Sequence, residues 1–428
     1  MTKRAWWLVA VNFLIPGSAQ LLAGNRRLGR FGVTATFVLV GLAIVALLLL
    51  WLWPVALYTL GTNSIVLTVA QVLLVGYAVL WVVLTLDTLR LVRLVRVGPA
   101  ARGFVAGLSI VGLVVTAGIA GYGAVVAGSA RSALSAIFDS GDYQPPVDGR
   151  YNILLLGGDA GPDRLGLRPD SISVASVDAT TGATVMIGVP RNLELARFSE
   201  GSPLYGPFPN GYDCGDDCLI SYLYTYGEEH PELYPEAQEN GSLPGIEAMR
   251  DAVEGVLGLT LQYYVLIDMQ GFSDLIDSLG GITLDVPERT PLAAAIPGAQ
   301  PFGWVEAGEQ HLDGQTALWY ARSRYESTDY ARMSRQRDVQ EAILRQFTPA
   351  NVLVKFQGVA AAGAQVVKTD IPSVMLGLFA DLATKSKKLP VTRLELVPDE
   401  FDPLYPDFDK IAAAIAAAFA ASSPTPAP

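Results

Sequence analysis

The sequence has few of the residues that build zinc sites. It contains two cysteines and two histidines among 428 residues. His230 and His311 lie far apart in the sequence, and the cysteines form one pair, Cys214 and Cys218. A structural zinc site needs four such ligands close together. The composition therefore argues against a zinc protein.

Acidic residues are almost missing from the first 130 residues. Asp87 is the single acid there, against nine lysines and arginines, which leaves a net charge of +8. The whole chain carries −11, so the remainder carries −19. The mean hydropathy of +0.35 is also high for a soluble protein. The two parts of the chain are therefore expected in different surroundings, and the acidic part has no basic patch suited to nucleic acid.

Three apolar stretches are long enough to cross a bilayer, which needs about 20 helical residues. They are residues 31–53, 64–86 and 103–126. Basic residues lie before the first stretch and between the second and third, whereas the connection 54–63 has no charge. The positive-inside rule then predicts a multi-pass cell-membrane protein with a cytoplasmic N-terminus, whose chain after about residue 130 lies outside.

An earlier apolar stretch, residues 5–23, is interrupted by Pro16-Gly17 and has basic flanks on both sides. A full crossing would leave one basic flank outside. We therefore expect a re-entrant or interfacial hairpin, and not a cleaved signal peptide. Residues 1–130 then form an N-terminal membrane region. The small, polar and proline-containing residues 131–150 are typical of a linker.

Residues 151–400 alternate between strand and helix patterns, which predicts an α/β domain with a central mixed sheet flanked by helices. Residues 151–156 form an apolar run typical of a buried strand. Residues 171–177 and 184–189 alternate around a Thr181-Gly182 turn and predict a hairpin. Further helices are expected at 246–257, 271–279, 316–320 and 333–347, and further strands at 263–267 and 283–286.

The remaining features of the outer part are short. Residues 401–421 include an alanine-rich helix over 411–421, and residues 422–428 have the composition of a disordered tail. In an oxidising compartment, Cys214 and Cys218 are expected to close a short loop by a disulfide.

Two acids lie at predicted strand ends, where ligand sites of α/β sheets are common. Asp159 follows the first strand and Asp170 precedes the second. Two carboxylates brought together repel each other unless a cation neutralises them. Oxygen ligands without histidine or cysteine favour Mg²⁺, or Mn²⁺, over other transition metals. The alternative is that Asp159 caps a turn and Asp170 caps a hairpin.

Arginines gather after the third predicted strand and again in residues 320–338 (YARSRYESTDYARMSRQRD). Pro190 ends the strand and presents Arg191 from a stiff backbone. A guanidinium cluster suits a phosphate or carboxylate anion. The alternatives are a surface arginine at residue 191 and a solvated helix face for the cluster.

The cluster divides by its spacing. Arg322 and Arg324 point to one side if their segment is extended, and Arg332 and Gln336 share a face of the helix that follows. We expect these four side chains to face one site. Arg337 is rotated away and is expected to be solvated, and the spacing leaves Arg335 undecided.

Residues 152 to about 347 resemble the catalytic domain of the LytR-CpsA-Psr (LCP) family. The motifs that support the resemblance follow one another in order: LGGD ending at Asp159, RPDS at 168–171, VPR at 189–191, YYVLID at 263–268, LGGI at 279–282, GEQHLDG at 308–314, YARSR at 320–324, DYAR at 329–332 and RQ at 335–336.

The resemblance implies a membrane-anchored phosphotransferase outside the cell. It would transfer an anionic or neutral glycopolymer from a polyprenyl-pyrophosphate carrier to peptidoglycan, with magnesium. By the motif match, Asp159 and Asp170 would hold the metal. The residues expected to bind the pyrophosphate or complete the site are Arg168, Arg191, Arg322, Arg324, Asp329, Arg332 and Gln336.

Some positions depart from the family's pattern. An acid usually follows the Pro-Arg pair, where this chain has Asn192, and a lysine is common where residues 219–222 read LISY. The membrane region exceeds the usual single span, and the composition hints at an actinobacterium. Two alternative functions remain, a prenyl-pyrophosphate pyrophosphatase and a non-catalytic glycolipid-binding regulator of the cell envelope.

Overall fold

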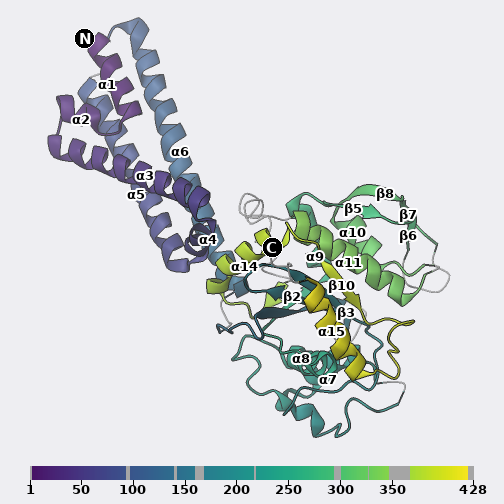
Figure 1. Ribbon diagram of the computed structural model, residues 1–428. Coiled ribbons are helices and arrows are strands. Elements are labelled where there is room, and N and C mark those ends of the chain that lie inside the picture. Colours follow the sequence, from purple (N-terminus) through teal and green to yellow (C-terminus); the bar gives the residue numbers. More distant parts are fainter. Residues whose placement is uncertain are drawn as a thin grey trace, which may run out of the picture. The chain divides into compact units, whose positions relative to one another are not determined.

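A computed structural model describes residues 2–92, 97–138, 142–159, 168–215, 218–293, 300–325, 327–346 and 367–422 (Figure 1). The chain divides into two compact units, Met1–Ser132 and Ala133–Pro428. The first is called here the membrane unit and the second the outer unit, and each is described by itself.

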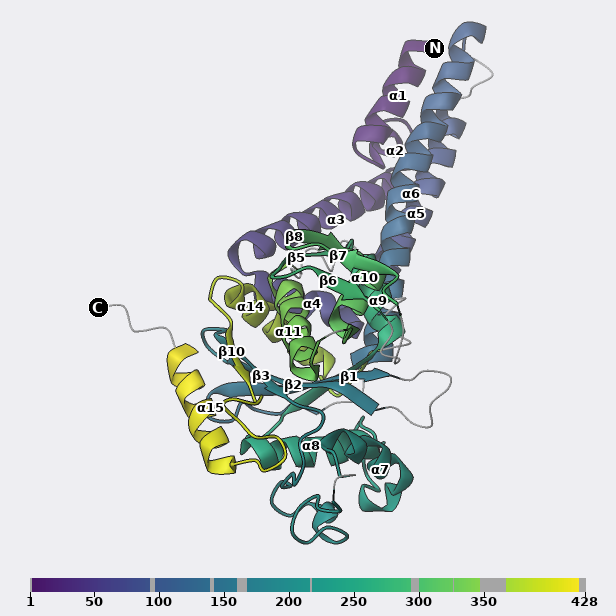
Figure 2. The same cartoon turned by 90° about the vertical axis from the view of Figure 1, so that its right-hand side faces the viewer.

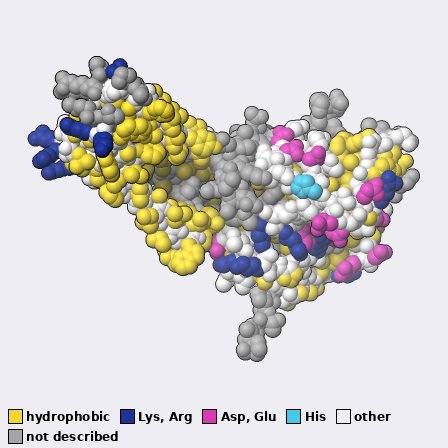
Figure 3. All heavy atoms as spheres, turned by 90° about the horizontal axis from the view of Figure 1, so that it is seen from above, with side chains coloured by type: hydrophobic (Ala, Val, Ile, Leu, Met, Phe, Trp, Pro, Cys, Tyr) yellow, Lys and Arg dark blue, Asp and Glu magenta, His cyan; other side chains and the backbone are white. Residues whose placement is uncertain are grey.

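The membrane unit is helical. Its helices are α1 (Thr2–Leu14), α2 (Ser18–Ala23), α3 (Arg26–Leu52), α4 (Pro54–Thr62), α5 (Ser64–Val92) and α6 (Pro99–Phe138). Three segments, Arg26–Leu52, Ser64–Val92 and Ala101–Ser132, are long and apolar enough to cross a membrane. Hydrophobic side chains cover much of the unit's surface, and lysines and arginines gather at one end (Figure 3). The predicted number of long apolar helices is confirmed.

The predicted hairpin at residues 5–23 is a helix–turn–helix formed by α1 and α2. Gly17 has a φ of 93°, and its N–H donates to Asn12 Oδ1 at 3.2 Å. A Cβ at Gly17 would lie 2.6 Å from the carbonyl oxygen of Gly29 in α3. The buried Gln20 donates from Nε2 to the Leu84 carbonyl of α5 at 2.9 Å. Glycine is required here because the turn touches α3 directly.

The outer unit is built on a six-stranded mixed sheet in the order β10-β3-β2-β1-β4-β9. Strand β2 pairs antiparallel with both β1 and β3. Strand β4 is parallel to β1, β10 is parallel to β3, and β9 is antiparallel to β4. The strands are β1 (Arg150–Asp159), β2 (Arg168–Asp178), β3 (Thr184–Val189), β4 (Tyr263–Asp268), β9 (Val367–Thr369) and β10 (Thr392–Glu395). The α/β class and the β2–β3 hairpin are confirmed.

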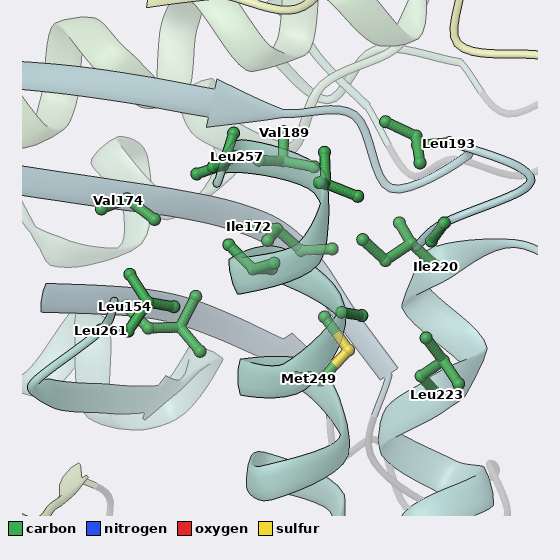
Figure 4. Close-up of a cluster of buried hydrophobic side chains, with 14 of the residues drawn as sticks. Leu154, Ile172, Val174, Val189, Leu193, Ile220, Leu223, Met249, Leu257 and Leu261 are labelled. Atoms are coloured by element: carbon green, nitrogen blue, oxygen red, sulfur yellow. The ribbon is translucent and has the colours of Figure 1, made fainter. Parts of the chain in front are cut away.

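Helices cover both faces of the sheet (Figure 2). On one face lie α7 (Leu223–Glu229), α8 (Pro244–Leu257) and α15 (Phe408–Ser422). Their apolar side chains pack against the strands: Met249 of α8, for example, shares a cluster with Leu154, Ile172 and Val174 (Figure 4). On the other side of the sheet are α9 (Met269–Leu279), α11 (Asp329–Gln346) and α14 (Leu376–Ser386).

A second, smaller core joins α10 (Gly314–Arg322) and α11 to two short sheets. One sheet pairs β5 (Ile282–Val286) with β8 (Gly308–Leu312), and the other pairs β6 (Thr290–Leu292) with β7 (Gly303–Val305). The predicted strand at 283–286 therefore exists but lies outside the central sheet.

Three further predictions can be compared with the structure. Helix α6 continues to Phe138, so the predicted linker 131–150 begins as helix. Cys214 and Cys218 are bonded to each other, as expected. The expected helix at 411–421 is α15, and the tail after Ser422 lies outside the described residues.

Candidate active site

Three strand ends meet at one edge of the central sheet. Because β1 and β2 run antiparallel, the end of β1 lies beside the start of β2, and the Cα of Asp159 pairs with that of Arg168. Strand β3 ends at the same edge, where Pro190 and Arg191 follow Val189. The topology thus gathers the LGGD, RPDS and VPR motifs, which are separate in sequence. The side chain of Asp159 lies outside the described part.

A cavity of about 340 Å³ opens at this edge. Its described lining consists mainly of charged residues. The segment 219–222, which includes the 3-10 turn Ile220–Tyr222, contributes three uncharged residues. The lining residues are Arg168, Asp170, Arg191, Asn192, Leu219, Ser221, Tyr222, Arg324 and Asp329. A pocket of this size and polarity suits a charged ligand group.

Asp329 joins three arginines at one wall of the cavity. It is the first residue of α11, and its Oδ1 accepts from Arg324 Nη1 at 3.1 Å. Its Oδ2 accepts from Arg191 Nε at 3.2 Å and from Arg332 Nη2 at 2.9 Å. Asp170 forms a second ion pair with Arg191. The carboxylates thus hold arginines from different segments in fixed positions.

The arginine side chains differ in exposure and in the effect of their surroundings. Arg191 is half-buried. Burial disfavours its charge, but Asp170 and Asp329 outweigh that effect and raise the pKa of Arg191. Arg332 is 3% exposed, and burial lowers its pKa to about 10 despite Asp329. Arg332 Nη2 also donates to the Asp170 carbonyl at 3.1 Å, and its Nε has no partner among the described residues.

The rest of the described lining is less charged. The guanidinium of Arg168 lies over the ring of Tyr222, 4.7 Å from its centroid. Asn192 donates weakly to Tyr330 at 3.5 Å, and its Oδ1 is buried without a partner in the described part of the chain. Leu219 also lines the cavity, and it belongs to the segment 219–222, where a lysine was expected from the resemblance. The two departures from the family's pattern therefore both lie on this cavity.

The guanidinium groups of Arg191, Arg324 and Arg332 contact Asp170 or Asp329, and that of Arg168 lies over Tyr222 in the same cavity. Among the described side chains at this edge, two positive charges are thus in excess, in a protein with a net charge of −11. The arrangement stabilises an anion, and charge-assisted hydrogen bonds from guanidinium forks suit phosphate oxygens.

The structure corrects the predictions for Arg322 and Gln336. Arg322 is the last residue of helix α10 and not part of an extended segment, and its guanidinium lies over Trp319, 5.2 Å from the ring centroid. Gln336 is buried, and its Oε1 has no partner among the described residues. Neither belongs to the described lining of the cavity, nor does Arg332, which contacts the lining residues Asp170 and Asp329 from behind, so the roles of these three residues stay predictions.

Arg335 and Arg337 are both buried, so the solvated position expected for Arg337 is wrong. Arg335 donates to the carbonyls of Tyr320 and Ser323 and fixes the segment that leads to Arg324. Arg337 pairs with Glu395 of β10. Their spacing contained no signal for these partners, because each partner comes from another element.

The LytR_cpsA_psr family model matches residues 127–402, which is more than half of the chain. The chain belongs to the LytR_cpsA_psr family. The matched region contains every strand of the central sheet and all the described residues of the cavity.

Relatives of this LytR_cpsA_psr protein include two transferases. TagU of Halalkalibacterium halodurans, named polyisoprenyl-teichoic acid–peptidoglycan teichoic acid transferase, is 26% identical over 271 residues, which are 60% of this chain and 76% of TagU. TagV of Bacillus subtilis, with the same activity in its name, is 26% identical over 206 residues, which are 48% of this chain and 45% of TagV. The match thus spans less than half of the length of TagV.

Solved structures of similar proteins include a crystal structure of TagV from B. subtilis. It has 22% sequence identity and a TM-score of 0.45, and the match covers 64% of this chain and 98% of that chain.

Proposed function

We propose that this protein is a membrane-anchored phosphotransferase that moves a glycopolymer from a polyprenyl-pyrophosphate carrier to peptidoglycan outside the cell. The single observation that best supports the proposal is the arginine wall of the cavity, held by Asp170 and Asp329. Family membership and the names of TagU and TagV support the same reaction class.

The residue types suit phosphoryl transfer, which depends mainly on positioning and on charge stabilisation. In the proposed reaction, a sugar hydroxyl of the acceptor attacks the phosphorus attached to the glycopolymer. A new O–P bond forms, the bridging O–P bond breaks, polyprenyl phosphate leaves, and the hydroxyl proton passes to solvent. Arg168, Arg191 and Arg324, which line the cavity, would orient the pyrophosphate and stabilise its charge, and the buried Arg332 would hold Asp329 and the Asp170 backbone in place.

A divalent cation is part of the proposal, with Mg²⁺ as the first candidate. Asp170 lines the cavity, and the backbone of Asp159 lies on the neighbouring strand. No group of three metal-ligating side chains occurs among the described residues. Mg²⁺ needs no such group, since it commonly binds one or two carboxylates plus substrate phosphates. Asp170 and Asp159 therefore fit its donor preferences, and the bound ion would neutralise pyrophosphate charge.

The topology is proposed from the charge pattern. Lys3, Arg4, Arg26, Arg27 and Arg30 flank the first apolar segments, so the positive-inside rule places these ends in the cytoplasm. Three crossings by α3, α5 and α6 then place the outer unit on the extracytoplasmic side. A membrane anchor suits a lipid-linked substrate, because enzyme and carrier share one membrane.

The test uses the full chain in detergent with a polyprenyl-pyrophosphate-linked glycan and Mg²⁺. We expect Arg191→Ala to lower kcat/KM by about 10²–10³, the effect of removing one positioned donor from a charged transition state. Arg197→Ala is the matched control, because Arg197 is exposed and lies over Phe408, outside the described lining. Full activity of Arg191→Ala would contradict the site.

A second measurement separates transfer from hydrolysis. Labelled lipid-linked glycan and peptidoglycan oligomers are supplied together, and label is expected in the peptidoglycan fraction. If label appears in free glycan alone, the protein is a pyrophosphatase and the transfer proposal fails. Asp170→Asn is expected to raise the Mg²⁺ concentration needed for half-maximal activity, and an unchanged requirement would remove Asp170 from the metal site.

A further inference from the structure

Both tryptophans of the outer unit, Trp304 and Trp319, lie in one surface feature. In strand β7, Trp304 lies on the face opposite to Val305, which turns into the second core, and Phe302 directly precedes the strand. Phe302 is 62% exposed and Trp304 is 45% exposed, whereas Val305 is 3% exposed. Large aromatic rings left in contact with solvent are unusual and often mark an interaction site.

The rings are held in defined positions. Phe302 packs edge-to-face on Trp319, with 5.0 Å between ring centroids. The Arg289 guanidinium lies over Trp304, 4.1 Å from its centroid, and that of Arg322 lies over Trp319. The residues Arg289, Trp304, Phe302, Trp319 and Arg322 are called here the aromatic strip. A preorganised surface of this kind loses little side-chain entropy when it binds a ligand.

The strip ends next to the candidate active site. Arg322 closes α10, and Arg324, two residues later, lines the cavity. The intervening Ser323 is buried, and its backbone carbonyl accepts from Arg335. The connection is therefore short and fixed, and a chain molecule bound along the strip would reach the cavity.

The side chains of the strip suit carbohydrate. The face of an aromatic ring is electron-rich, and the C–H groups on one face of a sugar ring carry partial positive charge. Arg289 also forms an exposed ion pair with Glu306 at 2.9 Å, which places donors and acceptors beside Trp304. Sugar hydroxyls can bond to both groups. A hydrocarbon surface would instead strip water from this ion pair, at a cost in free energy.

We propose that the aromatic strip binds the glycan chain of the acceptor and directs its hydroxyl to the cavity. This proposal rests on the proposed function, since it names the binding surface for the second substrate. Trp304 is the ring chosen for the test, because it is exposed and lies against Arg289, which pairs with Glu306. It is a substrate-binding residue in this proposal and takes no part in breaking the pyrophosphate bond.

The test compares Trp304→Ala with Tyr405→Ala in the full chain in detergent. Tyr405 is an exposed aromatic residue outside the strip and serves as the matched control. The probe is soluble, uncrosslinked peptidoglycan oligomers, and the affinity is measured by calorimetry. We expect Trp304→Ala to weaken binding about tenfold, the upper range of one aromatic contact. Trp304→Phe should retain most of the affinity, and Tyr405→Ala should retain all of it.

Hydrolysis of the lipid-linked pyrophosphate in the absence of acceptor distinguishes the strip from the active site. Trp304→Ala should hydrolyse at the wild-type rate, which also shows that it is folded, while its KM for the acceptor rises. If wild-type protein transfers glycan but Trp304→Ala binds oligomers with unchanged affinity, the strip proposal is overturned and the proposed function stands. If wild-type protein cleaves no carrier even when the acceptor oligomers are present, the proposed function itself fails.

A lipid surface is the competing occupant. In nanodiscs that contain brominated acyl chains, contact with lipid would quench the fluorescence of Trp304, so wild-type protein would lose more signal than Trp304→Ala. This result would overturn the proposal. If the strip faces water and glycan, the absolute signal lost to quenching is expected to be equal in the two proteins, because the same tryptophans of the membrane unit are quenched in both.

Discussion

Replacing Arg337 should reveal how strongly a buried ion pair joins α11 to the edge of the central sheet. Arg337 is 2% exposed, and its Nε donates to Glu395 Oε1 at 3.0 Å. Its other nitrogens contact Gln340 and, at 3.4 Å, the carbonyl of Ile172 in β2. Arg337→Met keeps much of the apolar length of the side chain and removes the charge.

The expected loss follows from the carboxylate that remains. Breaking a buried pair by removing one partner costs about 3–5 kcal/mol, because the other charge stays buried and unpaired. The Glu395 side chain is 21% exposed, and the cation of Arg393 also favours its charge. We therefore expect the lower limit, about 3 kcal/mol near neutral pH.

The loss should depend on pH. Burial raises the pKa of Glu395 above its usual range even with Arg337 present, and Arg337→Met should raise it further. A carboxyl with a higher pKa in the folded state binds its proton more tightly there. Stability therefore falls as pH rises from the unfolded pKa through the folded pKa. The destabilisation by Arg337→Met should be smaller at acidic pH and full at neutral pH.

Denaturant unfolding of residues 133–428 measures both effects. Trp304 and Trp319 are the only tryptophans of this unit and provide the fluorescence signal. Combining Arg337→Met with Glu395→Gln removes both charges and should restore stability to within about 1 kcal/mol of wild type. A loss below about 1 kcal/mol for the single variant, or an equal loss in the double variant, would refute the reasoning.

Two further predictions concern packing and positioning. A Cβ at Gly188 would lie 1.9 Å from Glu395 Oε2, so Gly188→Ala should destabilise the outer unit by about 1–3 kcal/mol in the denaturant assay. Gly303→Ala is the control, because its Cβ would meet only ordinary contacts, and it should be nearly neutral. Arg335→Lys cannot reproduce the fork that holds two carbonyls, so Arg324 should shift and kcat/KM for the lipid-linked substrate should fall about tenfold or more. Unchanged kinetics would show that Arg335 does not position Arg324.

The membrane helices, the main strands and the disulfide could be predicted from the sequence because their signals are local. An apolar run of about 20 residues, an alternating pattern or a short cysteine spacing needs no knowledge of distant residues. The motif order predicted a site of nine residues, and the structure places five of them, Arg168, Asp170, Arg191, Arg324 and Asp329, on one cavity. Arg322, Arg332 and Gln336 lie outside its described lining.

The partners of the arginines were decided by the tertiary structure. Arg335 and Arg337 stand two residues apart in a polar stretch, and local spacing could not predict that both are buried. Arg337 is buried because β10, 58 residues later in the chain, brings Glu395 to it. Arg335 is buried because α10 ends with carbonyls that need donors.

The sequence by itself determined the class of the protein, its division into an apolar basic part and an acidic part, and the residue types available to an anionic ligand. Tertiary structure decided which cations form the site. Arg191, Arg324 and Arg332 meet at Asp329, while Arg322 turns to Trp319. The physical reason is that the position of a charged side chain depends on the groups that it contacts. Here those groups come from strands and helices that only the fold brings together.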